Sequence, residues 1–383
     1  MNYREKLKEA HRIIFKFGTN VLTRKDGTMA LSRIYSFIES ISDLKKQNKE
    51  ILIVTSGAVG LGAKRLRMES KPTLSTLKKA CAAVGQGQLT SIYEEGFDKF
   101  NIVTAQVLLT DEDFSDRKRY LSLRNTLSTL LELGVIPIIN ENDTVSTHDL
   151  TTCKKPKPGS SCFGENDKLS ALVMSKLGAD VLVILTDVDG LYDDDPRINP
   201  HAKVIPVVTR IDEQIEALGF DASQRGKGGM KTKIEAAKIA VHSGGMAVIA
   251  NGKKEGTINK IFDGEETGTL FIPIEQLSSR KRWIAYATNI TGVIMVNEGA
   301  KDALIQKNAS LLPSGIVDIK NDFEKNDVIS IADENGKEFA RGMANYSSED
   351  AKQLIGKKTG EIKKILGHKE SDEIVNRDNI VIL

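Results

Sequence analysis

Two segments of the sequence place lysines beside glycines, a combination suited to binding phosphate. Lys16 is followed closely by glycine and threonine in KFGT, and its ammonium can neutralise charge on a phosphoryl group during transfer. Segment 226–233, GKGGMKTK, precedes a helical pattern, so its backbone N–H groups and its lysines can together hold an anion. The competing interpretations are a strand-end lysine that simply reaches solvent and a solvated glycine loop.

A further glycine-rich turn, TSGAVGLG, spans residues 55–62 and carries Ser56 between a strand pattern and a helical pattern. Such a turn can offer backbone N–H groups to an anion, although many strand-to-helix turns are rich in glycine. No Gly-x-x-x-x-Gly-Lys-Ser/Thr sequence occurs in the chain, which excludes a P-loop. If a nucleotide binds, another scaffold holds it.

Amides and carboxylates gather in two other segments. Residues 140–143, NEND, directly follow an apolar run and can fix the ammonium and carboxylate of an amino acid, with a solvated loop as the alternative. Asn166 and Asp167 open a helical stretch, where the helix dipole favours a carboxylate that can cap the first turn. Capping accounts for one of these two residues but not for both.

Thr186 and Asp187 end another apolar run, and three aspartates follow at residues 193–195. The acidic run is compatible with a divalent cation, but aspartate beside glycine and proline also forms ordinary turns, which is the interpretation we favour. We therefore take Thr186 and Asp187 as the stronger candidates and assign no metal ligands.

These segments follow short β-branched runs that alternate with helical patterns over residues 1–270. Runs that are apolar throughout indicate strands buried on both faces of a parallel sheet. We therefore predict an α/β fold with a doubly wound, mainly parallel sheet, in which ligands bind beyond the carboxyl ends of the strands. The predicted strands are Arg12 to Phe17, Ile51 to Thr55, Ile102 to Leu109, Val135 to Ile139, Val181 to Leu185 and Ala247 to Ala250.

The chain has 383 residues, more than one hydrophobic core usually supports, so we expect two domains. The composition changes over residues 265–282, where we place a linker. We expect a large catalytic domain over residues 1–270 and a small, mostly β domain over residues 279–383. Its predicted elements include a helical stretch around Ser347 to Ile355 and a closing strand, Asn379 to Leu383.

Composition limits the classes of function. Hydrophobic residues make up 40% and charged residues 28%, as in soluble globular proteins. A net charge of +2 from 54 basic and 52 acidic residues gives no field that favours nucleic acid or an anionic membrane. The charged N-terminus and the lack of a long apolar segment lead us to expect a cytoplasmic protein without membrane contact. Cys81, Cys153 and Cys162 are too few for a disulfide framework and should mostly be thiols.

In their order and context, KFGT, VTSGAVGLG, INEND, GENDKLSA, TDVDGLY and GGMKTK resemble the amino acid kinase family, and within it most closely the glutamate 5-kinases. From RKRW onward, VNEGAKDAL and SLLPSGI resemble the PUA domain that many glutamate 5-kinases carry. The resemblance spans essentially the whole chain. It implies transfer of the γ-phosphate of ATP to the side-chain carboxylate of L-glutamate, which gives L-glutamyl 5-phosphate in the first step of proline synthesis.

The resemblance also implies roles for individual residues. Lys16 and Lys233 match lysines that stabilise charge on the transferring phosphoryl group, and Asp167 matches the carboxylate that orients them. The glutamate-binding positions of the family are matched by Ser56, Asp143 and Asn166. Its ATP-binding positions are matched by Lys16, Thr186, Asp187, Lys227, Gly228, Gly229, Met230, Lys231, Thr232 and Lys233, although the family often has threonine at the position of Lys227.

The implied reaction needs Mg²⁺ bound with ATP, an ion that phosphates and water usually hold without a dedicated protein cage. Because the acceptor carboxylate is already ionised, positioning and charge neutralisation can supply the catalysis. The acyl phosphate product hydrolyses readily, which implies a glutamyl phosphate reductase as the next enzyme. Feedback inhibition by proline and a homo-oligomer are further expectations.

Two alternatives stay open. Acetylglutamate, carbamate and aspartate kinases share the fold, but INEND and the PUA-like tail argue against them. PUA domains elsewhere bind RNA, whereas residues 279–383 contain 16 basic and 16 acidic residues, so RNA binding is disfavoured. The loop between Asp143 and Gly164 is about ten residues longer than expected. In this loop Cys153 and Cys162 have pairing and metal binding as alternatives to free thiols.

Overall fold

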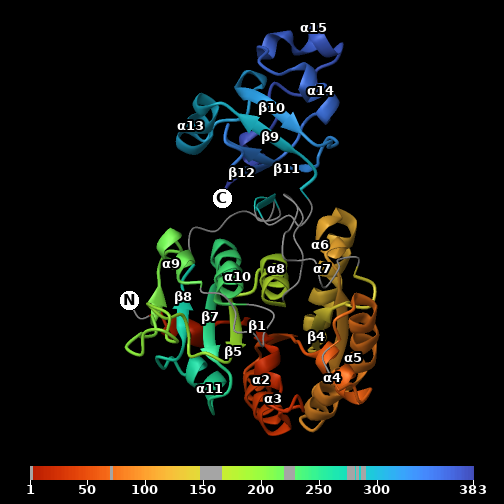
Figure 1. Cartoon of the computed structure of the whole chain (residues 1–383), viewed down its shortest axis with the longest axis vertical. Coiled ribbons are helices and arrows are strands. Elements are labelled where there is room, and N and C mark those ends of the chain that lie inside the picture. Colours follow the sequence, from red (N-terminus) through yellow and green to blue (C-terminus); the bar gives the residue numbers. More distant parts are fainter. Residues whose placement is uncertain are drawn as a thin grey trace. The chain divides into compact units, whose positions relative to one another are not determined.

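The computed structural model describes residues 3–69, 72–146, 166–219, 229–273, 281, 284–285 and 290–383. The described residues fall into two compact units, the first reaching residue 273 and the second following it. In Figure 1 the first unit is coloured red to green and the second blue. Within the described ranges, no helix is both long and apolar enough to cross a bilayer.

An eight-stranded sheet forms the centre of the first unit, in the order β3-β4-β2-β1-β5-β7-β8-β6. Its neighbouring pairs are parallel except for β7 with β8. From β1 the chain winds to β2 and β4 on one side and to β5 and β7 on the other, which is the doubly wound arrangement. The strands are β1 (Arg12–Phe17), β2 (Glu50–Val54), β3 (Thr104–Leu109), β4 (Ile136–Glu141), β5 (Val181–Thr186), β6 (Val207–Val208), β7 (Met246–Asn251) and β8 (Thr269–Phe271).

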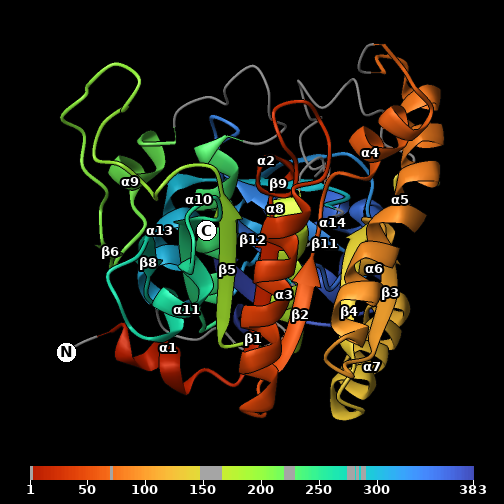
Figure 2. The same ribbon diagram turned by 90° about the horizontal axis from the view of Figure 1, so that it is seen from below.

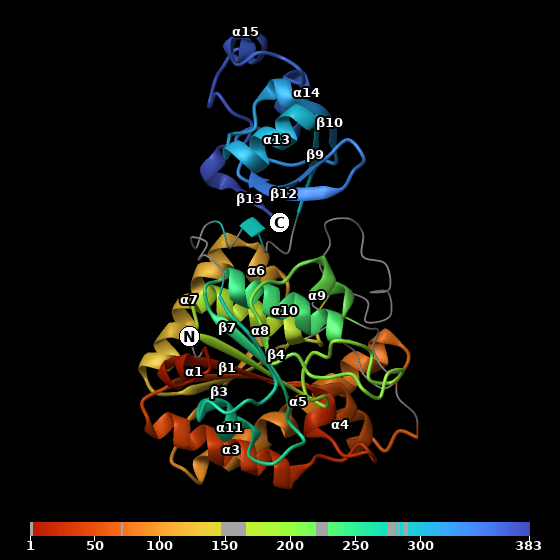
Figure 3. The ribbon, with the colours of Figure 1, turned by 90° about the vertical axis from the view of Figure 1, so that its left-hand side faces the viewer.

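Helices cover both faces of this sheet. In Figures 1 and 3, α3 and α11 lie on one face and α8 and α10 on the other. Figure 2 is seen from the side of α3, which lies across the sheet in front of β1 and β2. The helices are α1 (Glu5–Glu9), α2 (Thr19–Leu22), α3 (Leu31–Lys46), α4 (Ala58–Arg65), α5 (Ser75–Asp98), α6 (Glu112–Ser115), α7 (Arg117–Glu132), α8 (Asn166–Leu177), α9 (Glu213–Ala217), α10 (Met230–His242) and α11 (Thr257–Phe262).

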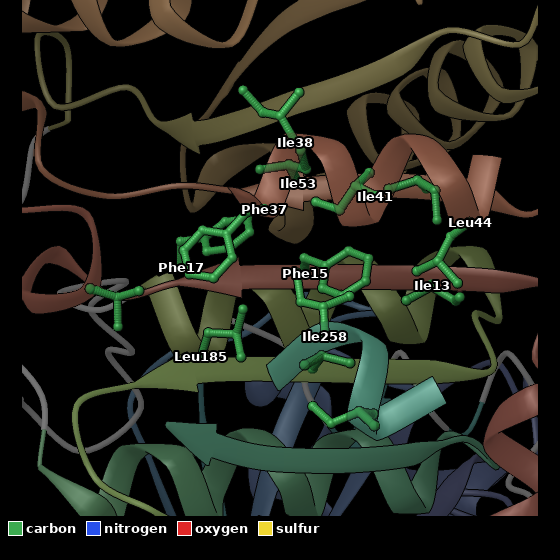
Figure 4. Packing of buried hydrophobic residues seen from close by; sticks show 14 of the residues in the cluster. Ile13, Phe15, Phe17, Phe37, Ile38, Ile41, Leu44, Ile53, Leu185 and Ile258 are labelled. Carbon is green, nitrogen blue, oxygen red and sulfur yellow. The ribbon is translucent and has the colours of Figure 1, made fainter. Parts of the chain in front are cut away.

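The alternation of side chains along β1 divides its residues between the two faces. Phe15 packs against Phe262 of α11, with ring centroids 6.0 Å apart. Phe17 packs against Phe37 of α3 at 4.9 Å, within the hydrophobic cluster of Figure 4. Because side chains alternate with a period of two, Lys16 points to the opposite face, which α8 and α10 cover. Burial of the two phenylalanines therefore fixes the direction of the lysine between them.

The predicted fold class is confirmed, and the predicted strands correspond to β1 to β5 and β7, with ends shifted by no more than two residues. The sequence pattern misses β6 and β8, which are too short to show a period. The expected linker over residues 265–282 is wrong in its first part, because that part contains β8. β8 is fully buried and pairs antiparallel with β7.

The second unit is small and mostly β, as expected. Its sheet has the order β10-β9-β11-β12-β13, and only β9 with β11 is parallel. It has a hydrophobic core of its own, which includes Ile294, Ile331 and Tyr346. Its elements are β9 (Val293–Val296), α13 (Glu298–Lys307), β10 (Ile316–Lys320), β11 (Val328–Ala332), β12 (Glu338–Met343), α14 (Ser348–Gln353), α15 (Ile362–Leu366) and β13 (Ile380–Ile382).

Helices α4 and α5 cross so closely that their contact requires glycine. A Cβ atom on Gly62 would lie 1.8 Å from the carbonyl oxygen of Cys81, and one on Gly85 would lie 1.9 Å from that of Ala58. A larger residue at either position would force the two helices apart. Because α4 begins directly after residues 56–57, the crossing of α4 and α5 also fixes the position of the turn formed by residues 56–57.

We expect Gly85→Ala to destabilise the first unit by about 1–3 kcal/mol, the usual range for overpacking a tight contact. Gly87→Ala is the matched control, because it lies on the same helix with no atom within 4 Å of an added Cβ. Alanine has a higher helix propensity than glycine, so Gly87→Ala should leave the free energy of unfolding unchanged or raise it by up to about 1 kcal/mol. Urea unfolding of both variants checks this, and equal stabilities would contradict the close crossing.

One lysine, Lys176, is buried on α8. Lys176 is 3% exposed, and its Nζ lies 3.5 Å from the centre of the Tyr120 ring and 4.8 Å from that of Phe114. Within the described residues its Nζ has no hydrogen-bond partner. Burial lowers the pKa of Lys176 to about 7, although Asp113 raises it, and Arg124 lowers it further. The ammonium is therefore held mainly by aromatic faces.

This environment predicts a pH-dependent stability. Between pH 7 and pH 10 an unfolded lysine keeps its proton while the folded one loses it, so the unfolded state binds more protons and stability rises with pH. We expect the unfolding free energy of the unmodified chain to rise over this range, relative to Lys176→Met, by up to about 1.4 kcal/mol per pH unit. The measurement is urea unfolding at pH 7 and pH 9. Lys118→Met, an exposed change on α7, serves as control and should keep the unmodified slope.

Candidate active site

The parallel strands bring the sequence candidates to one edge of the large sheet. Lys16 of β1 lies beside Val54 of β2, which lies beside Ile139 of β4. On the other side of β1, Phe17 lies beside Leu185 of β5. The loops that leave the carboxyl ends of these four strands therefore start next to one another. This is the arrangement that the sequence predicted for a ligand site.

A carboxylate between two ammonium groups lies at the centre of this edge. Asp167 Oδ1 lies 2.5 Å from Lys16 Nζ, and Asp167 Oδ2 lies 3.2 Å from Lys233 Nζ. All three side chains are less than a tenth exposed, at 2% for Asp167, 7% for Lys16 and 9% for Lys233. The structure thus joins β1, α8 and α10 through three residues that are far apart in the sequence.

The two lysines set the ionisation of Asp167. Burial raises the pKa of Asp167, but Lys16 and Lys233 outweigh it and hold the pKa well below its usual range. Asp167 therefore stays ionised at neutral pH, and this one carboxylate contacts two ammonium groups. Buried charges are costly unless they are paired, and here one carboxylate lies between two cations. The arrangement suits an incoming anion such as a phosphoryl group.

The first turns of α8 and α10 are tied together at the cluster. Thr232 Oγ1 lies 3.0 Å from Asp167 Oδ2 and 3.0 Å from the carbonyl oxygen of Gly229. Lys233 Nζ also donates to the Gly229 carbonyl, at 3.4 Å. The two helices pack against each other along their length. The N–H groups of the first turn of α10 are therefore held at the same edge as the ammonium groups.

Asn166, the first residue of α8, connects the cluster to β2 and β4. Its Nδ2 donates to the carbonyl oxygen of Thr55 at 2.5 Å, to Ser56 Oγ at 2.9 Å and to Asn140 Oδ1 at 2.9 Å. The next residue after Ser56, Gly57, has φ of +104°, a left-handed conformation that glycine adopts readily, and it caps α4. This turn places Ser56 against Asn166.

On the β5 side, Asp187 is held by two neighbouring elements. Its Oδ2 accepts from Asn20 Nδ2 at 3.0 Å and lies 3.5 Å from Lys253 Nζ. Burial raises the pKa of Asp187, but Lys253 and the hydrogen bond from Asn20 outweigh it and hold the pKa below its usual value. Thr186 Oγ1 lies 3.4 Å from Asp187 Oδ1. A second polar group therefore forms beyond β5.

Most of the sequence candidates fall into these two groups. Lys16, Asp167 and Lys233 meet in one ion cluster, and Ser56 meets Asn166. The remaining described candidates lie after strands or at the start of α10. Asp143 lies in the turn after β4, Thr186 ends β5 and Asp187 follows it. At the start of α10 are Gly229, Met230, the exposed Lys231, and Thr232, which contacts Asp167. Lys227, Gly228, Cys153 and Cys162 lie outside the described residues.

Several polar residues of the site escape sequence reasoning. Asn20 and Lys253 pair with Asp187, and Asn140 bonds to Asn166. Asn140 belonged to the candidate segment 140–143, but nothing in the sequence singles it out from its neighbours. A polar residue directly after a buried strand was the available signal. This signal does not show which of the polar side chains points into the site.

Several carboxylates of this edge are engaged by cations or amides. Asp189 lies 2.9 Å from Lys254 Nζ and accepts from Asn251 Nδ2 at 2.8 Å. The aspartates of residues 193–195 accept local bonds of a turn, including those from the backbone N–H of Lys203 and the guanidinium of Arg197. Among the described residues, no group of three or more His, Cys, Asp and Glu side chains is arranged to hold a metal ion. The turn interpretation of residues 193–195 agrees with this geometry.

Family models match both units. Residues 11–251 match the model described as the amino acid kinase family, and residues 292–366 match the model of the PUA domain. The first match covers the sheet edge described above, from β1 through β7. The second lies within the small β unit.

Proteins named glutamate 5-kinase are similar over almost the whole chain. The one from Thermoanaerobacter sp. (strain X514) is 46% identical over 374 residues, which cover 97% of this chain and 98% of that protein. The one from Moorella thermoacetica is 44% identical over 379 residues, 98% of this chain and 97% of that protein. A solved structure, UMP kinase from Bacillus anthracis, covers 70% of this chain and 98% of its own with a TM-score of 0.45 at 16% identity.

The ion cluster makes Asp167 important for stability. Asp167→Asn would leave two buried ammonium groups facing a neutral amide, and we expect a loss of about 3–5 kcal/mol, typical of breaking a buried pair. Asp43→Asn is the control, because Asp43 pairs with Lys46 on the exposed surface of α3 and should cost less than about 1 kcal/mol. Urea unfolding at pH 7 compares the two variants. Equal stabilities would show that Asp167 does not balance the lysines.

Proposed function

The chain belongs to the amino acid kinase family, and we propose that it acts as a glutamate 5-kinase whose transfer centre is the cluster of Lys16, Asp167 and Lys233. The reaction moves the γ-phosphate of ATP to the side-chain carboxylate of L-glutamate. The observation that carries the assignment of the centre is the pair of buried ammonium groups that Asp167 holds together between β1, α8 and α10. A phosphoryl group in transfer carries the complementary charge.

The two lysines would act on the transferring group from two directions. Both ammonium groups are fixed in place by one carboxylate, so they need little rearrangement when charge develops on the phosphoryl oxygens. The acceptor carboxylate of glutamate is ionised at neutral pH, so no general base is required. Asp167 is then a positioning residue, because both of its oxygens are occupied by the lysines.

Glutamate binding is proposed for the polar groups beyond β2 and β4. Ser56 and Asn166 are in contact there, and Asp143 stands in the turn that follows β4. Asn166 adjoins Asp167 in the chain, so a glutamate held by Asn166 would have its side-chain carboxylate close to the ammonium groups. The proximity of these two residues supports a substrate site beside the transfer centre.

ATP binding is proposed for the other side of β1. Thr186 ends β5 and Asp187 follows it directly. Gly229 precedes α10, and Met230, Lys231 and Lys233 lie in the first turn of that helix, whose N–H groups favour phosphate. The proposed set also includes Lys227 and Gly228. Kinases generally take ATP together with a divalent metal ion, and here we propose Mg²⁺ that enters with ATP and is held by its phosphates. The engagement of Asp187 and Asp189 by lysine and asparagine side chains supports that assignment.

The chemistry of the product suggests the surroundings of the reaction. An acyl phosphate is readily hydrolysed, so we propose transfer to a glutamyl phosphate reductase within the cytoplasm, where ATP and free glutamate occur. Feedback inhibition by proline and assembly as a homo-oligomer are proposed with it. A second function in RNA binding is not favoured, because residues 279–383 carry 16 basic and 16 acidic residues.

Turnover measurements test the assignment directly. We expect Lys16→Met and Lys233→Met each to lower kcat about 10²–10³-fold, since each removes a fixed charge that acts on the transition state. Lys238→Met is the control, because Lys238 lies on α10 but pairs with the partly exposed Glu216 and should keep full activity. ADP release with glutamate, N-acetylglutamate, carbamate and aspartate identifies the acceptor.

The folded state of each variant is checked by thermal unfolding, because losing one lysine weakens the ion cluster. Folded variants with unchanged kcat would refute the transfer centre. Activity that does not depend on glutamate would refute the acceptor.

A further inference from the structure

A line of hydrogen-bonded side chains runs from α5 to Asn166. Gln86 Nε2 donates to Thr90 Oγ1 at 3.2 Å, and Gln86 Oε1 accepts from Asn140 Nδ2 at 2.8 Å. Asn140 Oδ1 in turn accepts from Asn166 Nδ2 at 2.9 Å. The line thus crosses from a surface helix, through the carboxyl end of β4, to the first residue of α8.

The hydrogen bonds determine which side-chain atom of each amide in this line is the oxygen and which is the nitrogen. The backbone N–H of Glu141 donates to Asn140 Oδ1 at 2.9 Å, so that atom must be the oxygen. The Nδ2 of Asn140 must then find an acceptor, and the side chain is only 2% exposed. Gln86 Oε1 is that acceptor. Without it a buried donor would be unpaired, which is costly enough to make Asn140 turn away.

The same reasoning fixes Asn166. The carbonyl oxygen of Thr55 can only accept, so the atom of Asn166 that lies 2.5 Å from it must be Nδ2. With Ser56 Oγ and Asn140 Oδ1 nearby, Nδ2 has three acceptors for its two hydrogens. Both hydrogens of Asn166 Nδ2 are therefore donated to protein acceptors. Its Oδ1, which accepts no hydrogen bond from the described residues, is left for a ligand that donates.

We propose that Gln86 is a positioning residue for the amino-acid substrate, acting through Asn140 to hold Asn166 with its Oδ1 toward the substrate ammonium. This inference rests on the proposed glutamate 5-kinase function. An ammonium donates hydrogen bonds and accepts none, so an oxygen presented at this place selects a free amino acid. An N-acylated analogue offers a single weaker N–H and more bulk.

The location of Gln86 suits a positioning role. It is partly buried on α5, next to Gly85. The tight contact of Gly85 with α4 fixes the position of this turn of α5 relative to α4. Thr90 Oγ1 also accepts from Gln106 Nε2 at 3.0 Å and so ties the line to β3. Gln86 is therefore anchored on two sides before it meets Asn140.

The test compares Gln86→Met with Gln88→Met. Methionine keeps the length of glutamine but has no oxygen to accept from Asn140, whereas Gln88 is exposed on the same helix and serves as control. We expect Gln86→Met to raise the KM for glutamate about tenfold, the effect of losing one hydrogen bond, with kcat and the KM for ATP nearly unchanged. Gln88→Met should change none of these values. The KM for glutamate should largely recover in Gln86→Glu, which keeps an accepting oxygen.

A double-mutant cycle separates positioning from a general structural effect. If Gln86 acts only through Asn166, Gln86→Met should have almost no further effect on the KM for glutamate in an Asn166→Ala background. Additive effects in the two backgrounds would overturn the proposal, as would an unchanged KM for glutamate in Gln86→Met. Should Gln86→Met not fold, the same cycle with Gln86→Leu and Gln86→Glu gives the answer.

Glutamate phosphorylation by the unmodified chain tests the proposed function separately from the role of Gln86. If it phosphorylates no glutamate, the function fails before Gln86 is tested. If it does phosphorylate glutamate and the variants behave alike, only the role of Gln86 fails.

Discussion

The site depends on the placement of three buried charges. One carboxylate, Asp167, contacts two ammonium groups, and each of the three side chains is less than a tenth exposed. Such a cluster is tolerable only if the backbone fixes all three groups, because a displaced lysine would leave Asp167 or its partner unpaired. The sheet and two helix starts supply that rigidity. The geometry that makes the cluster costly is also what makes it receptive to a phosphoryl group.

The parallel sheet explains why residues so far apart in sequence converge. Side chains that follow β1, β2, β4 and β5 must share one edge, since parallel strands end on the same side. The two-residue period along β1 then sends Lys16 to the face of α8 and α10, while Phe15 and Phe17 fill the other face. The hydrophobic pattern of the six residues of β1 therefore determines the direction of the Lys16 side chain.

Much of this could be predicted from the sequence, and the remainder could not for identifiable reasons. Lys16 and Thr186 stand at the ends of apolar runs, where the fold class alone marks them as candidates. β8 is three residues long and shows no hydrophobic period, so the sequence pattern predicts a linker where this strand lies. Gln86 lies in the middle of a helix, where an amide normally faces solvent. Its partner Asn140 is 54 residues away, and no local pattern reports such a contact.

The first two residues of α8 join the two halves of the site. Asn166 bonds to the turn after β2 and to the end of β4, which stand on the side of α4 and α5. Asp167 bonds to Lys16 and to the start of α10, on the side where phosphate would lie. Because neighbouring residues at a helix start cannot move independently, the acceptor carboxylate and the phosphoryl group would be brought into register by one backbone segment. A small shift of α8 would misplace both substrates together, so close packing of α8 against the sheet and α10 serves alignment as well as stability.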